Sequence, residues 1–513
     1  LKNEALTPAL YLEAKEKGFL DEEIANFTKK SKQEIERLRK ENSISASFKI
    51  VDTCAAEFKA YTPYYYSTYN EIDENEVDNK NKKILILGSG PIRIGQGIEF
   101  DYCSVHAAWE VRNNNYKSLI VNSNPETLST DFDVADKLFF EPMNIENIMN
   151  IIEKENPEGV MVQFGGQTAI NLAPKLHERG VKILGTSIDS INAAEDRKLF
   201  EELLNNLNIP QPKGFAVRKQ SEALEVAKTL GYPLLVRPSY VIGGRGMQVV
   251  YNKDELISYI DGALKFSDEH PILIDQYIEG TELELDAIAD GEDVLIPAIT
   301  EHIERAGVHS GDSIALYPTR TIPKEIIEKL VIYTKKIAKA LKIKGLMNIQ
   351  FVLKDNVAYI IEVNPRASRT VPILSKVTGI PMVKIAVEAI LGKSISEQGY
   401  KTGLAEETQL ICAKIPIFSF QKLNRIDPAL APEMKSTGEV LGIDTSYGRA
   451  LAKGFLAAGY ELSDKRGNVL ISINDHYKEA SVEVAQTLVE LGYRLVATTG
   501  THKFLKLRNI ESK

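Results

Sequence analysis

The chain has few cysteines, no long apolar segment and no block of basic residues, and each absence excludes a class of protein. Cys54, Cys103 and Cys412 are odd in number and far apart. They form neither a disulfide framework nor a zinc site, so a reducing, cytoplasmic location is expected. No apolar run approaches the roughly 20 residues that a membrane-spanning helix needs, and no secretory signal is visible. A membrane is therefore not an expected partner.

Charge and length indicate a protein of several domains that does not bind nucleic acid. The 513 residues carry a formal net charge of −9, which together with the lack of a Lys/Arg block argues against a nucleic-acid partner. The hydrophobic fraction of 43% and the charged fraction of 26% are ordinary for a globular protein. The length predicts three or four domains. Because the chain begins at Leu1 and its last domain looks unfinished, we expect a piece of a longer protein.

The first part of the chain is predicted to be helical and to end in a linker. Thr7 before Pro8 is typical of a helix start, and Ser31 with Glu34 has the spacing of a capping box. The tyrosine-rich segment that follows is interpreted as a packed connection between domains, with a stacking surface as the alternative. Residues 70–83 are acidic and rich in asparagine, which is typical of a linker.

A parallel α/β layer is predicted over the next 120 or so residues, from strand–helix alternation. The predicted strands are residues 84–87, 118–122, 159–163 and 182–184. The glycine-rich loop 88–97 lacks the dinucleotide fingerprint, because its third glycine comes too late. The loop 165–168 follows a strand, at the carboxyl edge where such sheets bind ligands. For both loops, tight strand-to-helix turning and a ligand role are open.

A different α+β block is predicted from residue 195 to residue 395. The glycine-rich segment 243–246 lies between two predicted strands and is typical of a lid whose backbone N–H groups close over phosphates. Any glycine-rich hairpin looks similar, so this pattern alone is not specific. Further on, Glu282, Glu284 and Asp286 alternate on one face of a strand. His309 lies in a polar glycine loop, where a general base and a hydrogen-bonding role are both open.

The stretch 346–370 gives the clearest indication of chemistry. Two apolar runs flank the polar turn 354–356, so a β-hairpin is predicted. Gln350 and Glu362 lie equally far from the last residue of that turn and could face each other across the strands. Glu362 and Asn364 share a face, because strand side chains alternate with a period of two. An ordinary hairpin with a polar rim is the alternative interpretation.

Gln350, Glu362 and Asn364 offer oxygen ligands alone. Such ligands suit Mg²⁺ or Mn²⁺, which keep several waters and bind nucleotide phosphates. Arg366 and Arg369 follow directly in the sequence and suit a transferring phosphoryl group. The residues by themselves therefore predict a divalent-metal- and ATP-dependent phosphoryl-transfer enzyme.

The last part of the chain begins with a stretch of several prolines and no clear periodicity, after about residue 405. From residue 467 a new α/β unit is predicted, with strands at 468–473 and 494–497 around a helix at 478–491. Residues 498–501 follow the second strand with three threonines and a glycine. They are interpreted either as a phosphate cradle or as an N-cap.

Six stretches in this order resemble the large subunit of carbamoyl phosphate synthetase, in particular its carboxy-terminal half. They are VDTCAAEF at 51–58, GQGIEFDY at 95–102, NPET at 124–127, QFGGQ at 163–167, AGVHSGDS at 306–313 and IEVNPRASRTVP at 361–372. The resemblance covers essentially all 513 residues and about half of the usual fused large subunit.

The resemblance implies an α/β and α+β multidomain protein. It has a helical amino-terminal region, a Rossmann-like pre-ATP-grasp domain, an ATP-grasp domain whose two lobes enclose ATP, and the start of a methylglyoxal-synthase-like regulatory domain. With a connection before the last of these, the expected boundaries are 1–70, 83–205, 206–400, 401–466 and 467–513.

The resemblance also implies a set of functional residues. The implied nucleotide contacts are Arg197, Arg237, Gly243, Gly244, Gln276, Ile278, Glu282, Gly307, Val308, His309, Ser310, Gln350 and Glu362. Among them the two arginines contact phosphates, the glycines belong to the lid, Gln276 and Ile278 line the adenine and Glu282 holds the ribose. The implied metal ligands are Gln350, Glu362 and Asn364, and the implied catalytic residues are Arg366, Arg369 and Arg245. K⁺ is implied at Glu304 and Ser310. The implied effector-phosphate ligands are Ser472, Lys478, Thr498 and Thr501.

In the family, the second synthetase unit phosphorylates carbamate with ATP, in a pathway that feeds pyrimidine and arginine biosynthesis. The implied partners are a glutamine amidotransferase small subunit, a first synthetase half that supplies carbamate, an allosteric nucleotide and further copies in an oligomer. Another ATP-grasp carboxylate–amine ligase and a non-catalytic nucleotide-binding half are the alternatives. The match at 306–313 argues against a biotin carboxylase, and the intact set Gln350, Glu362, Asn364 and Arg366 argues against a non-catalytic half.

Overall fold

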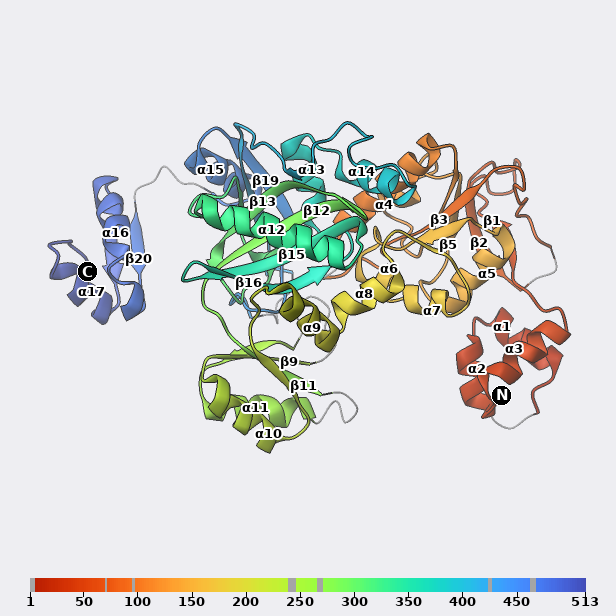
Figure 1. Cartoon of the computed structure of the whole chain (residues 1–513), viewed down its shortest axis with the longest axis horizontal. Coiled ribbons are helices and arrows are strands. Elements are labelled where there is room, and N and C mark those ends of the chain that lie inside the picture. Colours follow the sequence, from red (N-terminus) through yellow and green to blue (C-terminus); the bar gives the residue numbers. More distant parts are fainter. Residues whose placement is uncertain are drawn as a thin grey trace. The chain divides into compact units, whose positions relative to one another are not determined.

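The computed structural model describes residues 5–69, 72–94, 97–238, 246–264, 271–422, 427–461 and 467–513. Its contacts divide the chain into two compact units, Leu1–Gly454 and Phe455–Lys513, and each is described by itself. Figure 1 labels the helices and strands along the chain. Among the described residues, no helix is both long enough and apolar enough to cross a membrane.

Three short helices open the chain, as predicted. They are α1 (Pro8–Glu16), α2 (Asp21–Thr28) and α3 (Lys32–Glu41). The Thr7 hydroxyl accepts the Leu10 N–H at 3.2 Å, and Ser31 with Glu34 forms the expected capping box. A small apolar core made mostly by Tyr11, Ile24 and Ile35 holds the three helices together.

A seven-stranded sheet follows, with strand order β1-β2-β5-β4-β3-β6-β7. All neighbours are parallel except β1 on β2. The strands are β1 (Ser47–Ile50), β2 (Tyr64–Thr68), β3 (Lys83–Leu87), β4 (Lys117–Asn122), β5 (Lys137–Phe140), β6 (Gly159–Met161) and β7 (Ile183–Leu184). The helices are α4 (Glu99–Asn113), α5 (Ile145–Glu155), α6 (Gly166–Ile170), α7 (Ala173–His177) and α8 (Ile188–Glu195). The parallel α/β layer predicted from the sequence is confirmed.

Three strands of this sheet were not expected. The tyrosine-rich segment is strand β2 rather than a connection between domains, and its Tyr65 and Tyr64 rings pack against Phe139 and Phe140 of β5 at centroid distances of 5.6 and 5.3 Å. Strands β1, β2 and β5 are only four or five residues long. Their sequences, SFKI, YYYST and KLFF, lack the continuous aliphatic run of β3, and the aromatic packing that holds β2 on β5 is tertiary.

Residues 214–276 form a small lobe with its own core, whereas Leu204 of the preceding helix packs into the core that contains Leu285 and Ile349. Helix α9 (Arg197–Leu207) leads into an antiparallel four-stranded sheet of order β10-β9-β11-β8, covered by helices α10 (Gln220–Leu230) and α11 (Lys253–Leu264). Its strands are β8 (Gly214–Val217), β9 (Leu234–Pro238), β10 (Gln248–Val250) and β11 (Ile272–Gln276). The strand–loop–strand unit β9–β10 is confirmed, while its loop residues Gly243, Gly244 and Arg245 lie outside the described residues.

The largest sheet has eight strands in the order β16-β15-β12-β13-β14-β18-β19, with β17 beside β13. The strands are β12 (Thr281–Asp290), β13 (Val294–Arg305), β14 (Ala315–Tyr317), β15 (Lys344–Lys354), β16 (Val357–Asn364), β17 (Gly403–Leu404), β18 (Ile411–Ile417) and β19 (Gly438–Asp444). The helices around it are α12 (Lys324–Ala340), α13 (Thr370–Thr378), α14 (Met382–Ile390) and α15 (Tyr447–Ala457).

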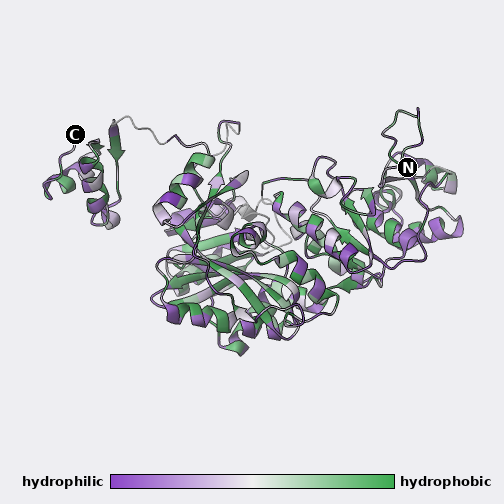
Figure 2. Ribbon diagram, turned by 90° about the horizontal axis from the view of Figure 1, so that it is seen from above, coloured by the Kyte–Doolittle hydropathy of each residue, from purple (hydrophilic) through white to green (hydrophobic). Residues whose placement is uncertain are grey.

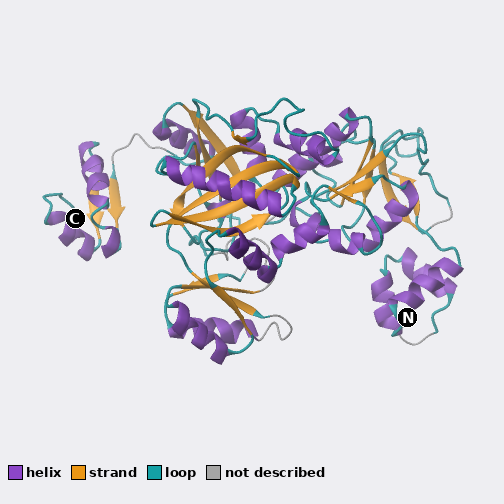
Figure 3. Cartoon of the chain, viewed as in Figure 1, coloured by secondary structure: helices purple, strands orange, loops and turns teal. Residues whose placement is uncertain are grey.

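Helices lie on both faces of this sheet. Helix α12 lies along one face (Figures 1 and 3), over an apolar core that includes Leu285, Ile349 and Phe351. Helices α13 and α14 pack on the other face and also against α4 of the parallel layer, so one continuous core joins the two layers. In Figure 2 the strands are mostly hydrophobic, whereas the helices also carry hydrophilic residues.

The stretch expected as a connection, 401–466, contains three strands of the large sheet, β17, β18 and β19. Strand β18 pairs with β14 and β19, and its five central residues are buried. Burial on both faces removes the alternation that would have marked it in the sequence. Pro416 lies beyond residues 412–414, which pair with β14, so its missing N–H leaves no gap in that ladder.

The second unit contains a parallel pair of strands, β20 (Asn468–Ile471) and β21 (Arg494–Ala497). Helix α16 (Ser481–Glu490) connects them, and α17 (Thr499–Lys506) follows β21. The α/β unit predicted from the sequence is confirmed. Ser472, Thr498 and Thr501 lie close together, since their hydroxyl oxygens are 3.3 Å apart from Ser472 to Thr498 and from Thr498 to Thr501.

A buried carboxylate ties the segment after β2 to the parallel sheet. Glu155 is fully buried and accepts hydrogen bonds from Asn75 Nδ2 (2.8 Å), Lys137 Nζ (2.7 Å) and Lys83 Nζ (3.0 Å). Burial alone would raise the pKa of Glu155, but the donors from Lys137 and Asn75 hold it below its usual value. The expected linker is therefore partly anchored to the sheet.

Replacing this carboxylate should destabilise the layer. Glu155→Gln leaves two buried ammonium groups without their counter-charge, and we expect a loss of about 3 kcal/mol in the free energy of unfolding. Urea unfolding followed by the fluorescence of Trp109, the single tryptophan, measures it. Glu158→Gln is the control, because Glu158 is exposed and 3.7 Å from Lys82, and it should change stability by less than about 0.5 kcal/mol. Equal effects of the two variants would contradict the expectation.

Candidate functional site

The hairpin expected from the sequence is present as β15 and β16. Its turn is formed by Asp355 and Asn356, both with positive φ (49° and 61°), as a type I′ turn requires. Lys354 therefore pairs with Val357, and a regular ladder from that turn would place Gln350 opposite Ile361. The equal spacing in the sequence does not by itself bring Gln350 and Glu362 together.

A β-bulge corrects the register. Phe351 pairs with Ile360, but Gln350 pairs with Glu362, so Ile361 is the extra residue. Ile361 and Glu362 are consecutive exposed residues in an otherwise alternating strand. The bulge turns Glu362 and Asn364 onto the face that carries Gln350, which confirms the predicted facing pair but for a different reason.

Polar side chains of four neighbouring strands share this face of the large sheet. Pairing of β12 with β15 places Glu284 opposite Gln350 and Asp286 opposite Asn348, and β13 adds His302 next to Glu284. Helix α12 covers the opposite, apolar face. Because side chains alternate along each strand, these polar residues share the face that α13 and α14 cover elsewhere with an apolar core, for example at Ile288 and Leu346.

The predicted metal ligands lie next to one another. Asn364 Nδ2 donates to Glu362 Oε1 at 2.9 Å, and Gln350 Nε2 donates to Ser310 Oγ at 3.2 Å. The amide nitrogens make these two bonds, and Asn364 Oδ1 also accepts from Arg366 at 3.2 Å, which leaves that oxygen one lone pair for a cation. Within the described part of the chain, no group of three or more His, Cys, Asp or Glu is arranged to hold a metal. One carboxylate with two amides fits Mg²⁺ that shares its coordination with nucleotide phosphates.

Arg366 is fixed by the parallel layer. Its Nε donates to Gln167 Oε1 at 3.1 Å, and one terminal nitrogen donates to Asn364 Oδ1 at 3.2 Å. Gln167 belongs to the loop 165–168, for which turning and a ligand role were both open. Gly165 is needed for the tight turn, since a Cβ there would collide with the carbonyl oxygens of Leu87 and Gly88, while Gln167 orients an arginine of the site.

Two carboxylates of β12 enclose a buried histidine. Glu282 accepts the Gly307 N–H at 3.0 Å and faces His302 Nδ1 at 3.3 Å, while His302 Nε2 lies 3.5 Å from Glu284. Burial opposes the charged imidazole, but the two carboxylates raise the pKa of His302 to about 9. Burial likewise opposes the charge on Glu284, and His302 holds the pKa of that carboxyl well below its usual value. Glu282 is thus held in place from both sides.

The glycine loop after β13 runs past the hairpin. His309 Nδ1 accepts the Gly311 N–H at 3.0 Å, and burial together with Arg369 and Lys414 lowers the pKa of His309 to about 3. This contact favours the hydrogen-bonding interpretation of His309 over that of a general base. Lys414 Nζ donates to the Ser310 carbonyl at 2.9 Å. Arg369 lies beside Gly311, where a Cβ would collide with its guanidinium, and it contacts Met434.

The two arginines expected at the nucleotide phosphates share one carboxylate. Asp275 of β11 is ion-paired with Arg197 of α9 and accepts Arg237 Nε at 3.2 Å. Arg197 Nη1 is buried and has no hydrogen-bond partner among the described residues, a donor that an anion would satisfy. Sequence reasoning missed Asp275, whose pairing depends on the register of β11 with β9.

The residues expected at the adenine lie where β11 ends. Gln276 is exposed at the last position of β11, and Ile278 is buried with Ala306 and Val352. Tyr277 donates its hydroxyl to the Ala306 carbonyl, and its ring fills the space beside Gly307, whose φ is +89°. Val308 is buried in the same loop. The small lobe and the large sheet therefore meet at this segment.

For other polar residues near the site, the sequence predicted a position or a role only in part. Glu304 accepts the Ile314 N–H at 2.6 Å, and burial raises the pKa of Glu304. The alternating acids of β12 were recognised in the sequence, but Glu284 and Asp286 had no assigned role. His302, Asn348 and Lys414 were missed, because isolated polar residues in buried strands carry no local signal.

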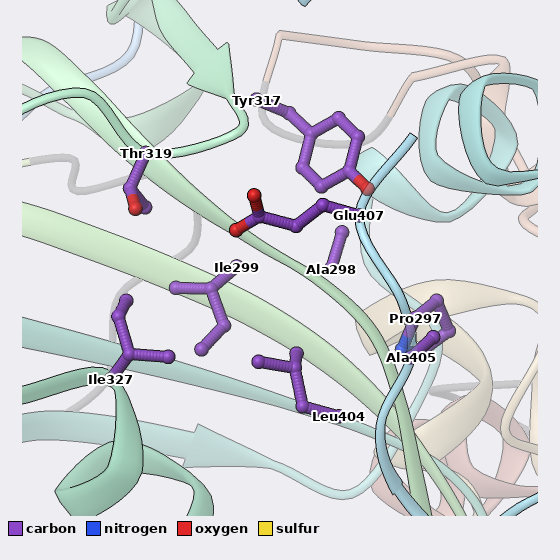
Figure 4. A pocket seen from close by; sticks show the side chains of 9 residues that line it. All are labelled: Pro297, Ala298, Ile299, Tyr317, Thr319, Ile327, Leu404, Ala405 and Glu407. Carbon is purple, nitrogen blue, oxygen red and sulfur yellow. The ribbon is translucent and has the colours of Figure 1, made fainter. Parts of the chain in front are cut away.

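A small pocket lies elsewhere on the large sheet. Figure 4 shows its lining side chains from β13, β14, α12 and the segment around β17, among them Tyr317, Ile327 and Glu407. None of the lining residues belongs to the polar face described above, so the pocket is not the candidate site.

Three family models match the chain. Residues 80–193 match a carbamoyl phosphate synthase preATP-grasp domain, residues 196–398 a carbamoyl-phosphate synthase L chain ATP binding domain, and residues 480–513 an MGS-like domain. The carbamoyl phosphate synthase large chain of Clostridium acetobutylicum is 58% identical over 500 residues, which are 98% of this chain and 47% of that protein. The chain thus spans about half the length of this curated relative.

Solved structures share the fold at low identity. The biotin carboxylase domain of Hydrogenobacter thermophilus 2-oxoglutarate carboxylase is 17% identical, with a TM-score of 0.53 over 66% of this chain and 75% of that one. N5-carboxyaminoimidazole ribonucleotide synthetase from Thermus thermophilus is also 17% identical, with a TM-score of 0.55 over 74% of this chain and 99% of that one. These likenesses concern the fold alone.

Together, the sheets and the matched domains define an ATP-grasp protein with a pre-ATP-grasp domain before the ATP-binding domain and an MGS-like domain after it. The expected fold class is confirmed. The chain belongs to the family of carbamoyl phosphate synthase large chains.

The charged state of His302 should give the fold a pH dependence. A raised pKa in the folded state means that the contribution is complete below about pH 6.5 and is lost as the pH rises through about 9. We expect the stability advantage of the wild-type protein over His302→Gln to be about 3 kcal/mol larger near pH 6 than near pH 9.5. Urea unfolding at both pH values measures it. His177→Gln, on the exposed end of α7, is the control, and a pH-independent difference for His302→Gln would contradict the assignment.

Proposed function

We propose that this chain phosphorylates carbamate with ATP to give carbamoyl phosphate and ADP, the last step of carbamoyl phosphate synthesis from bicarbonate, ammonia or glutamine, and two ATP. The observation that carries the proposal is the polar face of the large sheet, on which Gln350, Glu362 and Asn364 lie next to Arg366. Membership of the large-chain family supports it. The related 2-oxoglutarate carboxylase domain, which shares the fold, was solved with MgADP and bicarbonate.

The reaction is an in-line displacement. A carbamate oxygen attacks the γ-phosphorus, an O–P bond forms, and the bond from phosphorus to the β,γ-bridging oxygen breaks, so that ADP leaves with the electron pair. Carbamate is already an anion, and no general base is needed. This agrees with the low pKa of His309, the one histidine of the glycine loop. Catalysis then depends on positioning and on neutralising charge.

The chain's own residues supply the nucleotide contacts. Glu282, oriented by Gly307 and His302, accepts the ribose hydroxyls. The adenine lies near Ile278 and Val308, with Gln276 at its edge. Arg197 and Arg237 face the phosphates, and lid residues Gly243, Gly244 and Arg245 are assigned by resemblance alone.

Gln350, Glu362 and Asn364 would hold the divalent cation, Mg²⁺ or Mn²⁺, and a second such ion is expected with the nucleotide. When bound, the metal neutralises charge on the β- and γ-phosphates. Arg366 and Arg369 contact the carbamate and the transferring group. K⁺ is proposed at Glu304 and Ser310, and the half-buried Glu304 carboxylate, which accepts the Ile314 N–H at 2.6 Å, follows the strand that leads into the glycine loop.

The partners and the location are proposed from the family and from the chemistry. Carbamate is short-lived in water, so a first synthetase half must deliver it directly, with a glutamine amidotransferase small subunit as the source of ammonia. An oligomer and an effector nucleotide at Ser472, Lys478, Thr498 and Thr501 follow from the same resemblance. A cytoplasmic location is consistent with free cysteines, of which Cys103 and Cys412 are buried.

The reverse reaction tests the proposal. The purified chain should form ATP from Mg-ADP and carbamoyl phosphate at fixed K⁺. Glu362→Gln should lower kcat by about 10²- to 10³-fold, because a ligand that is ionised for the metal becomes neutral. Glu328→Gln, an exposed carboxylate on α12, should leave it unchanged. A folded, ADP-binding chain that makes no ATP would refute carbamate phosphorylation by this chain alone. Adding a separately produced first half then shows whether that half completes the site.

Gly307 offers a test of the nucleotide position. Its φ is +89° and a Cβ would lie 2.8 Å from the Tyr277 ring, so Gly307→Ala must displace the loop against which the nucleotide is proposed to lie. We expect the Kd for Mg-ADP to rise by about tenfold or more, on the order of 1.4 kcal/mol. Gly291→Ala is the matched control, since Gly291 also has positive φ (+103°) but open space around it. Calorimetric titration measures both, and equal effects would argue against a nucleotide at Gly307.

A further inference from the structure

A carboxylate outside the proposed nucleotide and metal contacts lies at the centre of the polar face. Asp286 of β12 is fully buried. Its Oδ2 accepts the Ser368 hydroxyl at 2.7 Å and the Thr370 hydroxyl, and its Oδ1 accepts Asn348 Nδ2 at 3.3 Å. Burial and the neighbouring Glu284 raise the pKa of Asp286 to about 7, against the effect of these hydrogen bonds. Burial of a charged group is costly unless it is hydrogen-bonded, and here three donors converge on one carboxyl.

The two hydroxyls belong to the segment that carries the arginines of the site. Ser368 and Thr370 flank Arg369, which caps α13 at its amino end. The Ser368 oxygen also accepts the Thr370 N–H at 3.1 Å. Asp286 therefore anchors the residue before Arg369 and the residue after it.

Different hydrogen bonds fix the beginning and the end of this segment. The Ala367 N–H donates to the Gln163 carbonyl at 2.9 Å, and Gln163 Nε2 donates to the Pro365 carbonyl at 3.2 Å. These bonds fix the beginning of the segment, where Arg366 lies. The hydroxyls of Ser368 and Thr370, by contrast, both donate to Asp286, and their oxygens lie 2.8 Å apart.

Arg369 is closely confined. Its guanidinium lies against Gly311, where not even a Cβ would fit, and it contacts Met434. At a pH above its raised pKa of about 7, the Asp286 carboxylate only accepts hydrogen bonds, whereas an amide of the same shape has one accepting atom and one donating atom. Negative charge is also favourable at the amino end of α13.

We propose that Asp286 is a positioning residue for phosphoryl transfer, which holds Arg369, through Ser368 and Thr370, at the place of the transferring group. The proposal rests on the proposed function for its effect on turnover, but the anchoring itself does not depend on that function. Asp286 touches neither nucleotide nor metal in this assignment, so it should affect kcat and not nucleotide affinity.

The experiment compares Asp286→Asn with Asp290→Asn in the full chain. Asp290 is the matched control, since it lies on the same strand and also accepts several N–H groups, among them that of Ile395 at 2.9 Å. In the ATP-forming assay, Asp286→Asn should lower kcat about a hundredfold, as expected for a displacement of about 1 Å. The Kd for Mg-ADP should change less than about twofold. Asp290→Asn should leave kcat unchanged.

Two further measurements keep the outcome decisive. Hydrogen exchange of the amides in 366–371 should become faster in Asp286→Asn and not in Asp290→Asn, and this readout needs no catalysis. If Asp286→Asn does not fold, Thr370→Val should lower kcat while Thr370→Ser, which keeps the hydroxyl, restores it. Unchanged kcat and exchange in Asp286→Asn, or a loss of Mg-ADP affinity equal to the loss of kcat, would overturn the proposal. If the wild-type chain shows no turnover but Asp286→Asn still makes the exchange faster, the proposed function is refuted. The anchoring role of Asp286 then stands.

Discussion

The register of the hairpin β15–β16 is the constraint on which the candidate site depends. A regular ladder from the type I′ turn at Asp355 and Asn356 would pair Gln350 with Ile361. The bulge at Ile361 shifts this pairing by one residue, so that Gln350 pairs with Glu362. Because side chains of a strand alternate, a slip of one residue would send Glu362 to the opposite face. The bulge is therefore what turns two ordinary strands into an oxygen-lined surface beside Arg366, while the core residues of the same strands stay under α12.

Several cations near this surface are matched by carboxylates of the chain itself. His302 lies between Glu282 and Glu284, and Asp275 pairs with Arg197 and Arg237. In a buried setting such pairs fix side-chain directions, because an unpaired charge would be costly. The side chains of the candidate site are thus held in place by the protein itself, as charge stabilisation without reorganisation would require in the proposed phosphoryl transfer.

The parallel layer contributes to the site although it lies apart in the sequence. Helices α13 and α14 share an apolar core with α4, and Gln167 orients Arg366 across 199 positions of sequence. The loop after β6 therefore serves both as a tight turn and as part of the candidate site. This dual use ties the pre-ATP-grasp domain of the chain to its ATP-binding domain.

Local sequence patterns were sufficient for the elements with strong periodicity or clear caps. The helix starts at Thr7 and Ser31, the strands β3, β4, β6 and β7, and the hairpins β15–β16 and β9–β10 were all predictable, because their signals lie within about ten residues. The residue types Gln350 and Glu362 also indicated a metal site. What the tertiary structure alone decided was partnership over long distances: the aromatic strand β2 on β5, the buried strand β18, the shared counter-ion Asp275 and the anchor Asp286. A local pattern cannot show which buried polar groups meet, since that depends on sheet register and on packing between layers.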